Sequence, residues 1–143
     1  MSTYATPRRP AHHRRPARPR PRVAAALALE SATLAVFATL HLSGALHVGS
    51  GSRGSYGAGT AEALICVALA CGASALARSP ARGRRVALWA LAFAIFGFLV
   101  GLSFTVGSGD AIDLAYHLAM LPVLVATALL LARRPSAHPP RAV

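Results

Sequence analysis

The 143-residue sequence contains no lysine, asparagine or glutamine, and only four acidic residues. Charged residues make up 13% of the chain, about half the share found in an ordinary soluble domain. Hydrophobic residues reach 55%, which excludes a chain that is disordered throughout. The two cysteines are too few for a disulfide-stapled scaffold. These absences indicate a small integral membrane protein.

The positive charge comes from arginine alone, and it gives a net charge of +11. Seven arginines lie in residues 1–22, four in residues 78–85 and three after residue 132. Arginine clusters that alternate with uncharged apolar stretches are typical of membrane topology. Nucleic-acid binding is disfavoured because no aromatic platform accompanies the arginines. We expect the basic tails to contact anionic lipid headgroups.

Four apolar segments are each long enough to cross a hydrocarbon core of about 30 Å at 1.5 Å per residue. None carries the polar outer face that a soluble four-helix bundle would show. Their connections are short and rich in glycine, serine or proline, which makes consecutive helices antiparallel neighbours. The sequence therefore predicts an all-α fold, a four-span antiparallel transmembrane helical bundle, with spans at residues 23–48, 60–78, 86–106 and 111–132.

The arginine distribution predicts the orientation of the bundle. The Arg- and Pro-rich residues 1–22, residues 78–85 around the second connection, and residues 133–143 hold 14 arginines, whereas the other two connections hold only Arg53. Because cytoplasmic segments collect arginine, we expect two cytoplasmic tails, the first of them disordered, on a multi-pass protein of the cell membrane. A cleaved signal peptide is disfavoured because its apolar region would far exceed the usual length of about 7–15 residues.

Ionisable side chains inside a membrane are costly, so they are the first candidates for a functional site. We estimate the depth of each ionisable side chain at 1.5 Å per residue from the middle of its span. Four of these side chains then lie in the half of the bilayer that faces the exterior. Asp113 and His117 are also four residues apart on one helix face. Two imidazoles and two carboxylates suit zinc, iron or manganese. The candidate metal ligands are His41, Glu62, Asp113 and His117.

Three other interpretations of these four residues stay open. They could form a structural polar cluster, with Asp110 and Thr60 as helix N-caps, Asp113 at the third helical position and Glu62 in a first turn. They could form a proton or small-substrate site that opens to the outer face. His41 and His117 could also hold a haem between them, although the narrow, Ala-rich bundle argues against it.

Glu30 lies in the inner half of the first span, eleven residues before His41 and on the same helix face. Glu30 and His41 could be the two ends of a proton path. A structural ion pair between Glu30 and an inner arginine, such as Arg78 or Arg85, is the favoured expectation.

The third span contains a GxxxG pattern at Gly97 and Gly101, which lets two helix backbones approach closely in lipid. We favour packing against another helix of the same chain over a homodimer seam. Pro122 lies near the middle of the fourth span, where it removes one backbone hydrogen bond and is expected to kink the helix.

Glu30 and His41 in the first span, GAGTAEA at the second and DLAYHLAMLP in the fourth together resemble uncharacterised small four-helix membrane proteins of actinobacteria. The sequence is similar in a looser way to the DoxX-like group. The resemblance implies an integral membrane protein without an assigned reaction. It draws attention to Glu62, Asp113 and His117, and it transfers no catalytic residue. We expect a non-enzymatic structural or complex-associated bundle. The alternative is a small transporter, or a proton-coupled or metal- or haem-binding redox-linked protein.

Overall fold

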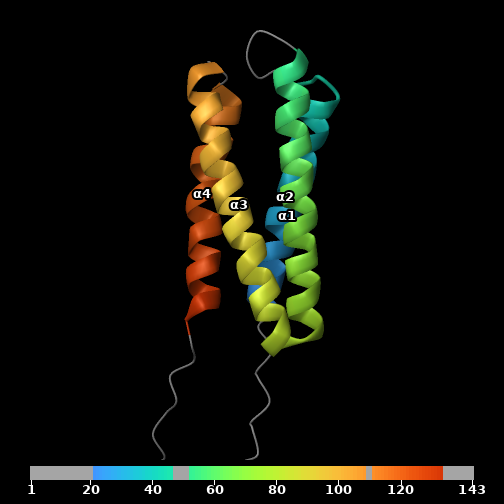
Figure 1. Cartoon of the computed structure of the whole chain (residues 1–143), viewed down its shortest axis with the longest axis vertical. Helices are drawn as coiled ribbons and strands as arrows, with labels where there is room; N and C mark the ends of the chain where they lie inside the picture. Colours follow the sequence, from blue (N-terminus) through green and yellow to red (C-terminus); the bar gives the residue numbers. More distant parts are fainter. Residues whose placement is uncertain (1–20, 47–51, 109–110, 134–143) are drawn as a thin grey trace, which may run out of the picture.

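A computed structural model describes residues 21–46, 52–108 and 111–133 (Figure 1). The shortest of its helices have 22 residues, or about 33 Å at 1.5 Å per residue, which is enough to cross a bilayer. The described ranges contain no strand. The predicted all-α four-helix bundle is therefore confirmed, with helices α1 (Pro21–Leu42), α2 (Ser52–Arg78), α3 (Pro80–Ser108) and α4 (Ala111–Ala132).

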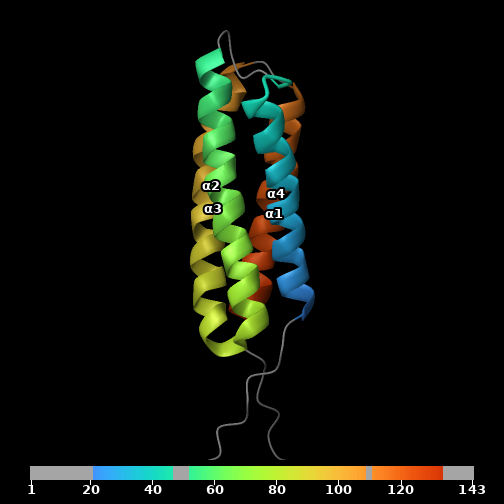
Figure 2. The ribbon, with the colours of Figure 1, turned by 90° about the vertical axis from the view of Figure 1, so that its right-hand side faces the viewer.

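Consecutive helices are antiparallel neighbours, and α4 returns to lie beside α1 (Figures 1 and 2). The start of α1, the α2–α3 turn and the end of α4 lie together at the lower end in Figure 1. We call this the basic end, because Arg22, Arg78, Arg84 and Arg133 flank the helices there. A closed ring of four helices lets side chains from different helices meet along its axis.

The outer surface of the bundle is apolar, whereas polar and ionisable side chains lie inside. Trp89, Phe96 and Phe104 on α3 are 77%, 66% and 70% exposed. A soluble domain has the reverse distribution, because water solvates polar groups and apolar groups are buried. The helices are also long and apolar enough to cross a membrane, so this is a multi-pass membrane protein. The buried polar residues include Glu30, Ser31, His41, Ser55, Glu62, Thr105, Asp113, His117 and Thr127.

Two helices have boundaries that differ from the prediction at the end opposite the basic end. Helix α1 ends at Leu42 rather than near residue 48. Gly44 closes it in the left-handed conformation at φ 75°, and the Ala45 N–H donates to the Leu40 carbonyl at 2.9 Å. Helix α2 begins at Ser52, so most of the expected glycine–serine loop is helical.

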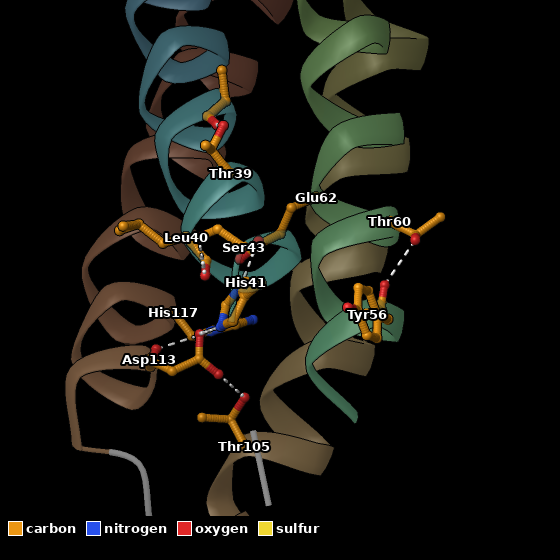
Figure 3. A network of polar contacts seen from close by, with 11 residues as sticks. Thr39, Leu40, His41, Ser43, Tyr56, Thr60, Glu62, Thr105, Asp113 and His117 are labelled. Carbon is orange, nitrogen blue, oxygen red and sulfur yellow. Dashed lines mark hydrogen bonds and ion pairs between the residues drawn. The ribbon is translucent and has the colours of Figure 1, made fainter. Parts of the chain in front are cut away.

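Small residues in the first turns of α2 are packing residues. A Cβ at Gly59 would lie 2.8 Å from Leu42 Cγ and 3.1 Å from the Ala38 carbonyl of α1. Ser55, one turn earlier, is only 3% exposed. The expected N-cap role of Thr60 is wrong, because Thr60 lies inside α2 and donates to the Tyr56 carbonyl at 2.7 Å (Figure 3).

At the basic end, α3 begins at Pro80, which leaves Ser79 as the only residue between α2 and α3. The expected basic turn is therefore mostly the first turns of α3. Arg84 in these turns donates from Nε to the Leu131 carbonyl at 3.0 Å and from Nη2 to the Ala132 carbonyl at 2.7 Å. A guanidinium group thus caps the C-terminal end of α4, where unpaired carbonyls favour positive charge.

The GxxxG glycines of α3 face other helices of the same chain. A Cβ at Gly97 would lie 2.6 Å from Ile65 Cδ1 of α2, and one at Gly101 would lie 2.6 Å from His117 Nε2 of α4. The two glycines therefore serve two different interfaces within the bundle. Helix α4 is continuous through Pro122. The tails before residue 21 and after residue 133, and the candidate cap Asp110, lie outside the described residues.

Candidate functional site

A buried hydrogen bond between α1 and α2 forms the first part of the site. His41 lies in the last turn of α1, and its Nδ1 is 2.7 Å from Oε2 of Glu62 on α2 (Figure 3). A carboxylate oxygen accepts, so Nδ1–H is the donor. His41 and Glu62 are only 1% and 5% exposed. Nε2, the other nitrogen of the His41 ring, has no hydrogen-bond partner among the described residues.

Asp113 brings α4 into the same site. It lies in the first turn of α4, and its Oδ1 is 3.9 Å from His41 Nε2. Its Oδ2 accepts a hydrogen bond of 2.8 Å from the Thr105 hydroxyl of α3 (Figure 3). Asp113 is 1% exposed. All four helices therefore contribute a polar side chain to one buried cluster, which we call the outer cluster: His41, Glu62, Thr105, Asp113 and His117.

His117 contacts Asp113 from the next turn of α4. Its Nδ1 lies 3.0 Å from the Asp113 backbone carbonyl and 3.3 Å from Asp113 Oδ1. The His117 ring also packs against Phe98, with ring centroids 5.0 Å apart. Its Nε2 points toward Gly101, where only a glycine leaves room for it. Both histidines thus meet Asp113, one on each side.

Three side chains of the outer cluster converge as a metal site requires. His41, Glu62 and Asp113 each offer one ligand atom, and these atoms lie within 4.8 Å of one another. Metal–ligand distances of about 2.0–2.2 Å allow two ligands to be roughly 4 Å apart, so a small inward rotation would bring the three onto one ion. His117 is not part of this convergent set, although the sequence placed it among the candidate ligands.

Two atoms of the convergent set are buried without a hydrogen-bond partner among the described residues. They are His41 Nε2 and Glu62 Oε1. Buried polar atoms are almost always hydrogen-bonded, so an exception calls for an explanation. An imidazole nitrogen and a carboxylate oxygen are also common ligands of zinc, iron and manganese. The donor set therefore fits a single metal ion.

The same geometry does not fit a haem. Axial ligation by two histidines needs both imidazoles to aim at one iron from opposite faces of the macrocycle. Here the Asp113 carboxylate lies between the rings, and His117 Nε2 points at α3. The space between the two rings is therefore filled by protein.

Glu30 forms a separate polar contact, closer to the basic end. It is 3% exposed on the same buried face of α1 as His41, as the spacing predicted. The expected arginine pair is wrong: within the described helices no arginine forms an ion pair with Glu30. Instead, the Thr127 hydroxyl of α4 donates to Glu30 Oε1 at 2.5 Å. An arginine at a helix end remains in the polar boundary region, whereas Glu30 lies two turns further into the bundle.

The sequence analysis missed the two threonines that contact buried carboxylates, Thr105 and Thr127. Thr127 follows Asp113 by fourteen residues, or four helical turns, so the two share a face of α4. Thr105 follows Gly101 by one turn on α3. Helical spacing from an ionisable residue is the signal that identifies Thr127, and helical spacing from a glycine of the GxxxG pattern is the signal that identifies Thr105.

Comparisons with models of protein families, with curated proteins and with solved structures find no match for this chain. The fold and the cluster define its class as a multi-pass membrane protein, a four-helix bundle with an ionisable interior.

Proposed function

We propose that this chain is a cell-membrane protein, with both termini in the cytoplasm, that binds a divalent transition-metal ion through His41, Glu62 and Asp113. The ion fastens α1, α2 and α4 to one another, so the role is non-enzymatic and structural. Zn²⁺ is the ion best suited to this donor set, because it accepts mixed nitrogen and oxygen ligands in a compact site.

The observation that carries the proposal is that His41 Nε2 and Glu62 Oε1 are buried without a hydrogen bond among the described residues, in a cluster that also holds the Asp113 carboxylate. Hydrogen bonding within the described cluster accounts for His41 Nδ1 and Glu62 Oε2 but leaves these two atoms without a hydrogen bond. Leaving a polar atom unsatisfied in an apolar interior costs about 1–3 kcal/mol. A bound ion would remove that cost at both atoms.

Charge balance supports a divalent ion. Two ionised carboxylates and a neutral imidazole carry two negative charges, and a divalent cation brings the set to neutrality. Uncompensated charge in a membrane interior is expensive, so a neutral set is strongly preferred. Protons on the histidines could supply the same charge, and this makes metal content the decisive measurement.

Other residues of the outer cluster would orient the ligands. Thr105 and His117 fix the two carboxylate oxygens of Asp113 from α3 and α4. Such supporting contacts hold a ligand in the geometry that the ion requires. The first turns of α2 and the end of α1 pack tightly at Gly59, which holds His41 close to Glu62.

The experiment is metal analysis of the detergent-purified full chain, before and after chelation, followed by titration with Zn²⁺ and with Co²⁺ as a coloured probe. We expect about one ion per chain and a visible Co²⁺ spectrum typical of four-coordinate sites. His41→Ala, Glu62→Gln and Asp113→Asn should each abolish binding. Glu30→Gln is the matched control, since it removes a buried carboxylate elsewhere and should bind normally.

A wild-type chain that binds neither ion above the level of Asp113→Asn would overturn the metal proposal. The outer cluster would then be a purely structural one, in which two protonated histidines balance two carboxylates and fix helix register.

The proposed orientation of the bundle, with both termini in the cytoplasm, is independent of the metal ion. It is supported by the arginines that flank the helices at the basic end, where we propose that anionic lipid headgroups bind.

A further inference from the structure

Glu30 is a buried carboxyl group that the proposed metal site does not use. It is the tenth of the 22 residues of α1, so it lies near the middle of a helix that is long enough to cross a bilayer. The side chain is packed inside the bundle, and the residue is 3% exposed. The Glu30 carboxyl group therefore lies in an apolar interior, where bulk water does not solvate it.

The two oxygens of the Glu30 carboxyl group have different surroundings. Oε1 accepts a hydrogen bond of 2.5 Å from the Thr127 hydroxyl of α4. Oε2 is buried and has no hydrogen-bond partner among the described residues. Since buried polar atoms are almost always hydrogen-bonded, the state of Oε2 calls for an explanation.

The ion pairs in the described part of the chain do not include Glu30. On α1 the nearest arginine is Arg22, which is eight residues, or about 12 Å, closer to the basic end. The Ser31 hydroxyl lies 3.4 Å from the Cys66 thiol of α2. Helix α4 contributes the Tyr116 phenol closer to the outer cluster, and the titratable side chains of α3 are arginines at its basic end. Thiol and phenol groups are uncharged at neutral pH, so an ionised Glu30 would have no counter-charge beside it among the described residues.

A multivalent metal ion does not fit at Glu30. Such an ion takes several ligand side chains, and the described residues hold one convergent set of three, which lies in the outer cluster. Glu30 offers a single carboxyl group with one hydroxyl neighbour. An unpaired carboxylate is costly inside a membrane, whereas a proton on Oε2 makes the group neutral. An uncharged O–H group also costs far less to leave without a partner than a charged oxygen does, so the ligand that suits Glu30 is a proton.

We propose that Glu30 is a reversible proton-binding site inside the bundle, with the proton on Oε2 and the Thr127 hydroxyl donating to Oε1. The neutral carboxyl group ties α1 to α4 without placing a charge between them. When the proton leaves, the carboxylate needs water around it, so α1 and α4 must separate locally to admit that water. Neither Glu30 nor Thr127 belongs to the outer cluster, so the proton site and the proposed metal site can each fail without the other.

The test is infrared spectroscopy of the purified full chain in lipid bilayers, because a protonated carboxylic acid has a C=O stretching band above the amide I band. The chain has only four acidic residues, so such a band can be assigned. At neutral pH we expect a band that Glu30→Gln removes. Thr127→Val should shift this band to higher frequency, because Oε1 loses its hydrogen bond, and Thr127→Ser should leave it in place. Thr39→Val is the matched control, since Thr39 is an exposed threonine of α1 that bonds to the Ala35 carbonyl.

The wild-type spectrum carries the test even where a variant fails to fold, because raising the pH should remove the band and returning to neutral pH should restore it. A wild-type chain without an acid band at neutral pH overturns the proposal. So does a folded Glu30→Gln variant that keeps the band, or a band that disappears only when the helical structure is lost. Zn²⁺ binding measured on the same preparations separates the two proposals, since Glu30→Gln should lose the band and keep the metal ion.

Discussion

Gly101 determines where the His117 ring can lie, although it has no side chain of its own. A Cβ at this position would come within 2.6 Å of His117 Nε2, well inside van der Waals contact. The ring cannot move away freely, because its Nδ1 is bonded at Asp113 and its face packs on Phe98. A methyl group at Gly101 therefore acts on the site through His117.

We predict that Gly101→Ala destabilises the bundle by about 1–3 kcal/mol, the usual cost of an added group in a tightly packed interior. It should also weaken metal binding, because a displaced His117 no longer orients Asp113. Thermal unfolding in detergent and Zn²⁺ titration measure the two effects.

Gly57→Ala is the control for Gly101→Ala. Nothing lies within 4 Å of a Cβ at Gly57, which is also inside a helix. The added methyl group should therefore raise stability by roughly 0.4–1 kcal/mol through the unfolded state. Equal unfolding temperatures and equal metal affinities for the Gly101→Ala variant and the wild type would show that His117 has no positioning role.

Much of the outer cluster could be predicted at the residue level, but its internal geometry could not. Depth along each span depends only on the helical rise, so it placed His41, Glu62, Asp113 and His117 in one layer. The orientation of each ring depends on its neighbours in other helices. The separation of His117 from the three convergent ligands follows from Gly101 and Phe98, which no spacing within α4 reveals.

At the scale of elements, the α2–α3 connection relies on a backbone contact at Gly83. Its N–H donates to the Ser79 carbonyl at 2.7 Å, and a Cβ at Gly83 would overlap the Ala75 carbonyl in the last turns of α2. We predict that Gly83→Ala costs about 2–3 kcal/mol, because backbone cannot yield as a flexible side chain can.

Thermal unfolding in detergent checks the Gly83→Ala prediction, and Arg82→Ala is the control. Arg82 is an exposed residue of the same turn, so its loss should change stability by no more than about 0.5 kcal/mol. If both variants unfolded at the wild-type temperature, the close approach of α2 and α3 at this turn would be unimportant.

The presence of four helices could be predicted from the sequence, whereas the end of α1 and the starts of α2 and α3 could not. The apolar stretches identify four spans because a bilayer requires their length. Residues 52–59 look like a loop because glycine and serine are weak helix formers. Tertiary packing overrides that preference, since Gly59 lets α1 and α2 approach and Ser55 is buried beside it. The expected basic turn fails for a related reason, since Pro80 starts α3 rather than ending a turn.

At the scale of the whole molecule, charge and hydrophobicity are arranged on different axes. Hydrophobicity varies radially, from the ionisable interior at His41 and Asp113 to exposed aromatics such as Trp89. Positive charge varies along the bundle and gathers where α1 begins and α4 ends. The radial variation allows the bundle to reside in a bilayer, and the axial variation is the basis for predicting which end faces the cytoplasm.

We predict that reporters placed ahead of Met1, after Arg82 and after Val143 report the cytoplasm, whereas reporters fused after Gly54 and Ser108 report the exterior. The reason is the 14-to-1 distribution of arginines between the two sets of connecting segments. An alkaline phosphatase and a fluorescent-protein series, active on opposite sides of the membrane, give each position two complementary signals. The most informative position is Gly54, because Arg53 is the only arginine between the end of α1 and Arg78. A cytoplasmic signal there would reverse the bundle and place the outer cluster near the inner leaflet. The three metal ligands would still converge, but the site would then take its ion from the cytoplasm. Glu30 would lie in the half of the bundle that faces the exterior.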